Sequence, residues 1–132
     1  MNELFIHMVG GTPAVYVKIW SPAKSIYRSL LLTLDTGAAT TTISRDVLHI
    51  LGYNTQSKEK KRIITASSIE YTDEVTLEKF IIAGFELFDV KAYAHSFPQE
   101  SYTGGVIGIN VLSDFDLFVS FQRKILGLTK IN

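Results

Sequence analysis

The stretch Ser29-Leu-Leu-Leu-Thr-Leu-Asp-Thr-Gly-Ala38 places an aspartate directly after a run of apolar residues. Such a short apolar run is typical of a strand buried on both faces. Asp35, Thr36 and Gly37 then favour a sharp bend, because glycine adopts backbone angles that other residues avoid and a threonine hydroxyl can fix the loop by hydrogen bonding. The carboxylate is expected at the edge of a buried layer. The Asp-Thr-Gly triplet by itself is explained equally well by an aspartate in an ordinary turn and by a functional aspartate.

Composition excludes several classes of protein. The chain has 132 residues, 13 basic and 13 acidic side chains and no cysteine. Because the net charge is zero, the chain as a whole is not attracted electrostatically to nucleic acid or to an anionic membrane. Without cysteine there is no disulfide framework, thiolate metal site or cysteine nucleophile. No run approaches the roughly eighteen apolar residues of a membrane span, and the first residues do not resemble a secretion signal. We therefore expect one domain over residues 1–132, in the cytoplasm, with neither nucleic acid nor membrane as a partner.

Most of the chain shows the period-two pattern of strands. In the segment 14–20, Val15, Val17 and Ile19 fall on one face. Hairpins are expected around Ser67-Ser68, around Ala83-Gly84 and around the turn 121–124. The further strands are expected at 29–34, 39–43, 62–66, 69–76, 77–82, 85–94, 116–120 and 125–129. These strands predict a mainly β, closed or nearly closed barrel.

One clear helix is expected between Ser44 and Gly52. Ser44 suits the N-cap, and Gly52 suits the C-terminal end. The residues expected to face the core are Val47, Leu48, Ile50 and Leu51. A second, shorter helical segment is expected at 109–115.

Four features, in order, resemble the retropepsin-like aspartic proteases, which are single-domain and dimeric. An apolar strand runs into Asp35-Thr-Gly-Ala38, and a hairpin near 64–68 follows the helix. The apolar-apolar-Gly element Val106-Ile-Gly108 lies about seventy residues after the aspartate, and a short helix and a final hairpin follow it. The resemblance covers roughly residues 14–128. It implies a retropepsin-like closed β-barrel with one or two short helices and an aspartic endopeptidase activity.

The resemblance also implies roles for particular residues. Asp35 would be catalytic, and a hairpin would fold over the substrate as a flap. The residues concerned are Thr36, Gly37 and Ala38 in the active-site loop, Ala66, Ser67, Ser68 and Ile69 in the flap, and Val106, Ile107 and Gly108 in the second motif.

The chain carries a single Asp-Thr-Gly triplet, whereas pepsin-like proteins carry two in a longer chain. Peptide hydrolysis without a metal or nucleophile needs one group to activate water and another to protonate the carbonyl oxygen. We therefore expect a homodimer that brings two copies of Asp35 around one water and acts on a peptide or protein. No cofactor is required. No metal is expected either, because His7, His49 and His95 lack a metal-ligand spacing.

Two departures from the family pattern stand out. Relatives have glycine at the flap tip, whereas this chain has Ser67-Ser68, which puts closure of the flap over substrate in doubt. Viral relatives carry an acidic residue and an arginine at the places held here by Ala39 and Ile109. Because both partners of that ion pair are replaced together, we expect the two positions to meet through apolar contact. This departure places the chain nearer the cellular and bacterial branches.

Several alternatives stay open. The apolar ends, 4–9 and 125–131, would interleave between subunits in relatives, but an edge strand within one chain fits the pattern equally well. The basic run 58–62 and the pair Asp73-Glu74 are expected to face water. A non-catalytic member of the same fold, acting as a peptide-binding or assembly module, is the main rival function. An unrelated barrel that binds a small ligand is a second.

Overall fold

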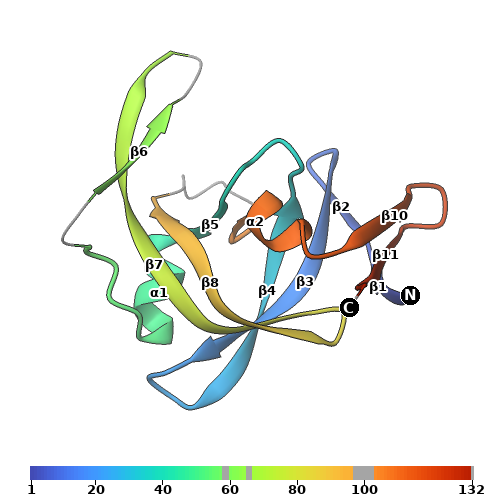
Figure 1. Cartoon of the computed structure of the whole chain (residues 1–132), viewed down its shortest axis with the longest axis horizontal. Coiled ribbons are helices and arrows are strands. Elements are labelled where there is room, and N and C mark those ends of the chain that lie inside the picture. The colour runs from blue at the N-terminus through green and yellow to red at the C-terminus, as the bar shows by residue number, and fades with distance from the viewer. Residues whose placement is uncertain (58–59, 65–66, 97–102, 132) are drawn as a thin grey trace.

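The strands form two sheets in the computed structural model, which describes residues 1–57, 60–64, 67–96 and 103–131. A three-stranded sheet has the order β1-β11-β10, and a larger sheet has the order β2-β3-β4-β9-β5-β8-β7-β6. β3 also pairs with β7, so the larger sheet curls back on itself into a barrel-like form (Figure 1). The elements are β1 Asn2–Phe5, β2 His7–Val9, β3 Thr12–Ser21, β4 Ile26–Leu34, β5 Thr41–Ser44, α1 Arg45–Leu51, β6 Lys60–Ile64, β7 Ile69–Ile82, β8 Phe85–His95, β9 Gly105–Ile107, α2 Ile109–Leu112, β10 Asp116–Ser120 and β11 Ile125–Thr129.

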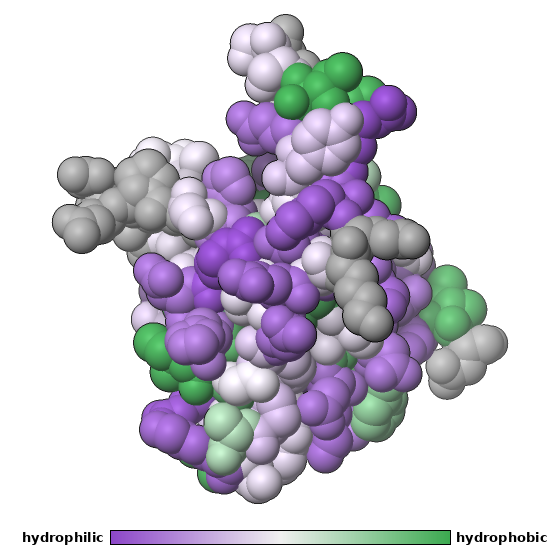
Figure 2. Space-filling model, turned by 90° about the vertical axis from the view of Figure 1, so that its left-hand side faces the viewer, coloured by the Kyte–Doolittle hydropathy of each residue, from purple (hydrophilic) through white to green (hydrophobic). Residues whose placement is uncertain are grey.

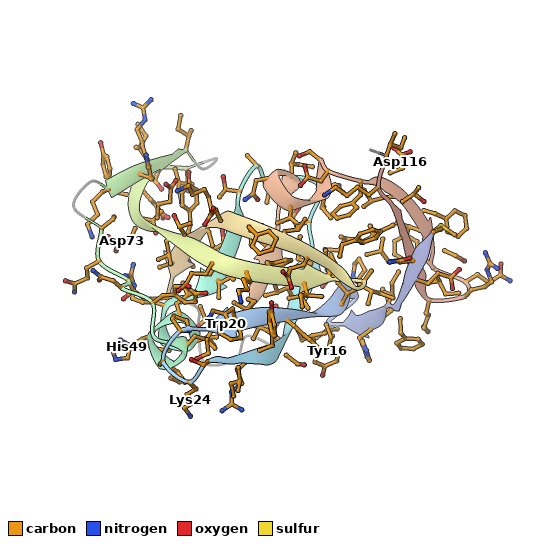
Figure 3. The ribbon with its side chains drawn as sticks, turned by 60° about the horizontal axis from the view of Figure 1, so that its bottom comes forward. Tyr16, Trp20, Lys24, His49, Asp73 and Asp116 are labelled. Carbon is orange, nitrogen blue, oxygen red and sulfur yellow. The ribbon has the colours of Figure 1, made fainter. Side chains whose placement is uncertain are left out.

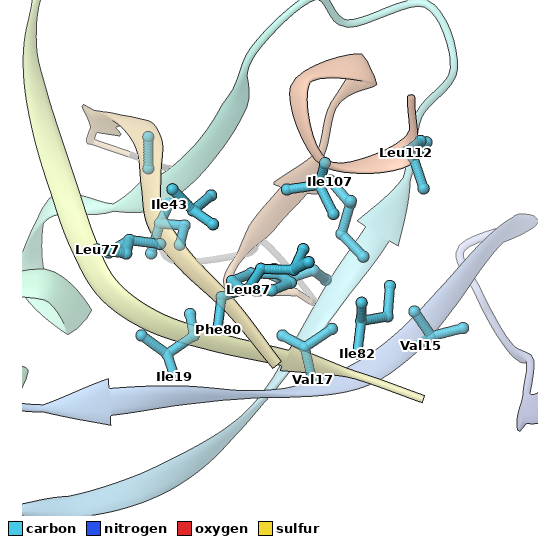
Figure 4. Packing of buried hydrophobic residues seen from close by; sticks show 14 of the residues in the cluster. Val15, Val17, Ile19, Ile43, Leu77, Phe80, Ile82, Leu87, Ile107 and Leu112 are labelled. Carbon is cyan, nitrogen blue, oxygen red and sulfur yellow. The ribbon is translucent and has the colours of Figure 1, made fainter. Parts of the chain in front are cut away.

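One hydrophobic core fills the barrel. Val15, Val17 and Ile19 of β3 point into it together, as their alternation predicts, and meet Phe80 and Ile82 of β7 (Figure 4). The hairpins predicted around 67–68, 83–84 and 121–124 are all present. The two strands expected at 69–76 and 77–82 are one continuous strand, β7.

The prediction that strand 29–34 is buried on both faces is wrong. Leu32 is fully buried, and Leu30 and Leu34 pack against the core beside it. The alternate residues, Ser29 and Thr33, lie on the outer face and are exposed or half-buried. The strand therefore has one core face and one outer face, because side chains alternate across a sheet.

α1 begins and ends where expected. The Ser44 hydroxyl accepts a hydrogen bond from the N–H of Val47 at 3.4 Å, and Gly52 ends the helix with φ of 100°. Leu48 and Leu51 are buried, but the expectation that Ile50 faces the core is wrong, since its side chain is 68% exposed. Ile50 lies about 200° around the helix from Leu48, on the opposite face.

The two chain ends pair with each other in the small sheet, at the right of Figure 1. Strand β1 runs antiparallel to β11, with Phe5 opposite Ile125, and β11 also pairs with β10. This is the edge arrangement within one chain that the sequence left open. Among the residues that the structure describes, no helix is both long and apolar enough to cross a membrane.

Candidate active site

The Asp-Thr-Gly loop and the second motif lie side by side. Strand β9 fits between β4 and β5, parallel to the first and antiparallel to the second, with Leu34 opposite Ile107. The backbone N–H of Asp35 donates to the carbonyl of Ile107 at 3.1 Å. Two segments about seventy residues apart in sequence are therefore in direct contact.

Asp35 is held within its own loop. Its Oδ1 accepts a hydrogen bond from the backbone N–H of Gly37 at 2.9 Å, and its carbonyl accepts one from Ala38 at 3.2 Å. A Cβ atom at Gly37 would lie 3.2 Å from Asp35 Oδ1, so a larger residue there would crowd the carboxylate. Asp35 itself is half-buried, whereas Thr36 and Gly37 are exposed. The carboxylate is thus oriented and still open to one side.

A buried clamp joins β5 to the second motif. The hydroxyl of Thr41 accepts from the N–H of Gly108 at 3.0 Å and donates to Asn110 Oδ1 at 2.9 Å. The same Asn110 oxygen accepts the N–H of Thr41 at 2.8 Å, and its amide nitrogen donates to the carbonyl of Lys91 at 2.8 Å. Sequence reasoning missed both Thr41 and Asn110. The only signal was the threonine-rich run before Ile43, which was assigned to strand propensity alone.

Gly108 allows the two segments to touch. A Cβ atom there would lie 2.5 Å from the carbonyl carbon of Thr40 and 2.9 Å from the carbonyl oxygen of Ala38, which are backbone atoms. The start of α2 then closes against the loop, because the N–H of Ile109 donates to the Ala38 carbonyl at 2.8 Å and the next N–H to the Ala39 carbonyl at 3.1 Å. Residues 38–39 and 109–110 are therefore joined by backbone hydrogen bonds, in which Ile109 pairs with Ala38 and Asn110 with Ala39. The side chain of Ile109 is 41% exposed, and the expected apolar contact between the two side chains stays a prediction.

A pocket of about 430 Å³ opens beside the Asp-Thr-Gly loop, under the β6–β7 hairpin. The hairpin projects from the body at the top of Figure 2, and apolar side chains gather near its tip. Ile64, Ile69 and Tyr71 are 57–71% exposed there. The pocket is lined by Gly37, Ala38, Ala39, Thr40, Thr42, Arg62, Ile63, Ile64 and Tyr93. Asp35 lines neither this pocket nor a larger hollow of about 610 Å³ beside β8, but Gly37, whose N–H it binds, lines the smaller pocket.

The hairpin matches the expected flap in its position. Its last described pair is Ile64 with Ile69, and Ser67 and Ser68 lie beyond that pair at the tip, both exposed. Ala66, which was also assigned to the flap, lies outside the described residues.

The prediction that Asp73 faces water is wrong, since this residue is 3% exposed. Its Oδ2 lies 2.9 Å from Arg45 Nη1, and its Oδ1 accepts hydrogen bonds from the Lys60 ammonium and from Ser57. The Lys60 ammonium, with help from Ser57 and Arg45, holds the pKa of Asp73 well below its usual range, against the opposing effect of burial. The partners were not visible in the sequence, because Arg45 lies 28 positions away. The basic run 58–62 was also expected to face water, but its Lys60 forms an ion pair with Asp73.

Within the described residues, no group of three or more His, Asp or Glu side chains is placed to hold a metal ion. His7 stacks edge-on between Phe5 and Tyr16, with ring centroids 4.8 and 5.1 Å apart, and His49 is exposed on α1.

Comparison with known proteins decides the family. The family model described as aspartyl protease matches residues 28–111, which include both motifs and the hairpin. The chain belongs to the aspartyl protease family. This aspartyl protease chain is similar to a retropepsin-like aspartic protease from Rickettsia conorii, with a TM-score of 0.70 and 18% identity. The match covers 96% of this chain and 89% of the other, and confirms the mainly β, retropepsin-like fold. No curated protein sequence matches the chain.

Proposed function

We propose that this chain is an aspartic endopeptidase whose active site is completed by a second copy of itself. One observation carries the proposal: the oriented carboxylate of Asp35 stands beside a pocket that an antiparallel hairpin overhangs. Membership of the aspartyl protease family supports the reaction class.

The need for a second copy follows from the chemistry. As water attacks the peptide carbonyl carbon, one carboxylate takes a proton from the water and a protonated carboxyl gives its proton to the carbonyl oxygen. When the resulting intermediate breaks its C–N bond, the carboxyl that took the proton from water gives it to the leaving nitrogen, and the other carboxylate takes a proton from a hydroxyl of the intermediate as the carbonyl re-forms. One carboxyl cannot perform both roles in one step, and the chain contains one Asp-Thr-Gly triplet. That two such carboxyls share a proton is an established property of aspartic proteases and is not a result of this structure.

The small terminal sheet offers a surface for the second copy. β10 is an edge strand, and Leu117, Phe118 and Val119 in succession are 36–43% exposed on it. Phe121 in the following turn is 59% exposed, and Phe5 of β1 is 58% exposed. An exposed apolar edge strand is a template for pairing with another chain. A two-fold axis beside this sheet would use the same patch on both protomers.

The substrate we propose is an extended peptide, bound as an added strand between the hairpin and the Asp-Thr-Gly loop. Such binding takes its affinity from backbone hydrogen bonds and its selectivity from side-chain pockets. In this arrangement Gly37 and Ala38 form the floor, and Ser67, Ser68 and Ile69 reach over the peptide. Thr36 would support the paired loops across the dimer axis, as the family resemblance implies.

A second candidate function is a non-catalytic peptide-binding module with the same dimeric site. The observation that favours it is the Ser67-Ser68 tip, where relatives have glycine. Serine adopts positive φ at a higher energetic cost than glycine, which would disfavour the tightest flap turns.

The variant Asp35→Asn tests the proposal. We expect cleavage of a peptide library to stop, because the variant loses the carboxylate that takes or gives the proton, while sedimentation still shows a mass near twice the 14.7 kDa of one chain. Asp89→Asn is the matched control. It makes the same chemical change on an exposed residue of β8 whose φ of 53° asparagine tolerates.

Undiminished turnover by Asp35→Asn would refute the catalytic role. A dimer that binds peptides but never cuts them would favour the binding module instead. A wild-type protein that is strictly monomeric and still cleaves peptides would refute the requirement for two chains.

A further inference from the structure

Strand β7 changes its partner at Asp73. This residue is in register with Lys60 of β6 and also with Ala94 of β8. From Asp73 to Ile82 the strand pairs along β8, whereas residues 69–72, toward the tip, pair with β6 and with no other strand of the described residues. The hairpin therefore extends beyond β8 from Asp73 onward, and we call this position its hinge. Figure 1 shows β6 and the adjoining part of β7 projecting from the body of the molecule.

The carboxylate of Asp73 gathers donors from both sides of that hinge. From the body, Arg45 at the start of α1 contacts Oδ2 at 2.9 Å, and Ser57 donates its N–H and its hydroxyl to Oδ1, each at 3.0 Å. From the hairpin, the ammonium of Lys60 contacts the same Oδ1. Figure 3 shows Asp73 at the base of the projecting hairpin.

The residues that contact Asp73 from the body of the molecule are themselves hydrogen-bonded to neighbouring segments. Arg45 also donates to the carbonyl of Ala94 at 3.3 Å and to the carbonyl of Thr55. The hydroxyl of Thr72 donates to the same Ala94 carbonyl at 2.6 Å. The carboxylate thus links Lys60 to Arg45 at the start of α1 and, through Arg45, to the end of β8.

Residues close to the hinge form the roof of the pocket. Arg62, Ile63 and Ile64, which line the pocket from above, follow Lys60 by two to four residues on β6. Strand β6 is the edge of its sheet, and β7 is its only strand partner among the described residues. The height of the roof above the Asp-Thr-Gly loop therefore depends on the angle of the hairpin at Asp73.

We propose that Asp73 is a positioning residue that holds the β6–β7 hairpin closed over the pocket and thereby strengthens peptide binding. This inference rests on the proposed function, because it assigns the hairpin the part of a substrate flap. The physical reason is charge balance. Without the carboxylate, the guanidinium of Arg45 on the body and the ammonium of Lys60 on the hairpin face each other and repel. Because the side chain of Arg45 is 32% exposed, it cannot fully exchange its lost partner for water.

The test compares Asp73→Asn with Glu74→Gln. The control makes the same change of charge one residue along β7, on the opposite face of the strand. Hydrogen exchange is followed at the amides of 60–64 and 69–72 and, for comparison, in β3 and β4. We expect Asp73→Asn to speed exchange in the hairpin by roughly ten- to a hundredfold, the range for a lost hydrogen bond to a charged group. Exchange in β3 and β4 should change less than twofold.

Peptide cleavage gives the second readout. We expect KM of Asp73→Asn to rise about tenfold while kcat changes little, because the hinge acts on binding and lies away from Asp35. The double variant Asp73→Asn with Lys60→Met removes the cation on the hairpin side and should lower both KM and hairpin exchange from the values of Asp73→Asn to those of Lys60→Met alone, which lacks the ion pair but has no repulsion. A purely structural role would give no such rescue.

Several outcomes would overturn the inference. These are unchanged hairpin exchange in Asp73→Asn, equal acceleration in the core, or a double variant worse than the single one. If Asp73→Asn does not fold, the single variant Lys60→Met tests the inference instead. It removes the contact between the hairpin and Asp73 but leaves the ion pair between Arg45 and Asp73 intact. Hairpin exchange equal to wild type in that variant would then refute the inference. If even the wild-type protein cleaves no peptide, the proposed function fails, while the exchange data still decide the hinge.

Discussion

The variant Thr41→Val tests the buried clamp beneath the Asp-Thr-Gly loop. Valine has nearly the shape of threonine, so the change removes the hydroxyl and little else. The hydroxyl accepts from the N–H of Gly108 and donates to Asn110 Oδ1, and Thr41 is fully buried. The backbone hydrogen bond from Thr41 to Asn110 remains.

The magnitude follows from these contacts. A buried N–H left without an acceptor costs about 1–3 kcal/mol, and the lost bond to Asn110 adds about 1 kcal/mol. The expected loss in the free energy of unfolding is therefore about 2–4 kcal/mol. For 132 residues the entropy of unfolding is about 0.28 kcal/mol/K, so Tm should fall by roughly 7–14 °C.

The assay is thermal unfolding, paired with urea unfolding at 25 °C. Thr76→Val is the matched control, because Thr76 is exposed on β7 and its hydroxyl accepts only a solvent-exposed hydrogen bond from Lys91. The free energy of unfolding of this control should change by less than about 0.5 kcal/mol. A Tm for Thr41→Val within about 2 °C of wild type would refute the reasoning, because the Gly108 N–H would then have found another acceptor or never have depended on this one. A cleavage rate that falls at 20 °C, where the variant is still folded, would show that the clamp also aligns Asp35.

Two further predictions concern stability against pH and assembly. Because folding lowers the pKa of Asp73, its contribution to stability is complete above the unfolded-state pKa near 3.9 and declines as the pH falls from there toward the folded-state value. The difference in unfolding free energy between wild type and Asp73→Asn, measured in urea, should therefore narrow between pH 6 and pH 2.5, and a difference that stays constant would contradict this. Phe118→Glu should give a folded monomer that no longer cleaves peptides, because it places a charge on the exposed apolar edge. Sedimentation and circular dichroism check this, and a fully active dimer would argue against the proposed surface.

The sequence predicted the fold well wherever local patterns decide structure. The alternation of Val15, Val17 and Ile19 identified a half-buried strand, and Ser44 and Gly52 marked both ends of the helix. The two motifs at residues 35–37 and 106–108 were identified from the family pattern, and the structure shows the two segments in contact, a pairing that no local rule contains.

Two of the failures are cases in which the environment of a residue comes from distant parts of the chain. Asp73 appeared to be a surface charge, because its cationic neighbours come from α1 and β6. Thr41 and Asn110 are 69 positions apart, and neither residue type indicates a buried hydrogen bond. Ile50 was assigned to the core from hydrophobicity, although a seven-residue helix buries only one narrow stripe.

The most direct test of the central claim is the distance between the Asp35 carboxyl groups of two protomers. It is measured in a crystal structure of the assembled protein bound to a statine-type mimic of the transition state. The account predicts that both carboxyls lie within hydrogen-bond reach of one inhibitor hydroxyl, close to a two-fold axis. An assembly in which the two carboxyls face away from each other, with the inhibitor held by one chain alone, would contradict it.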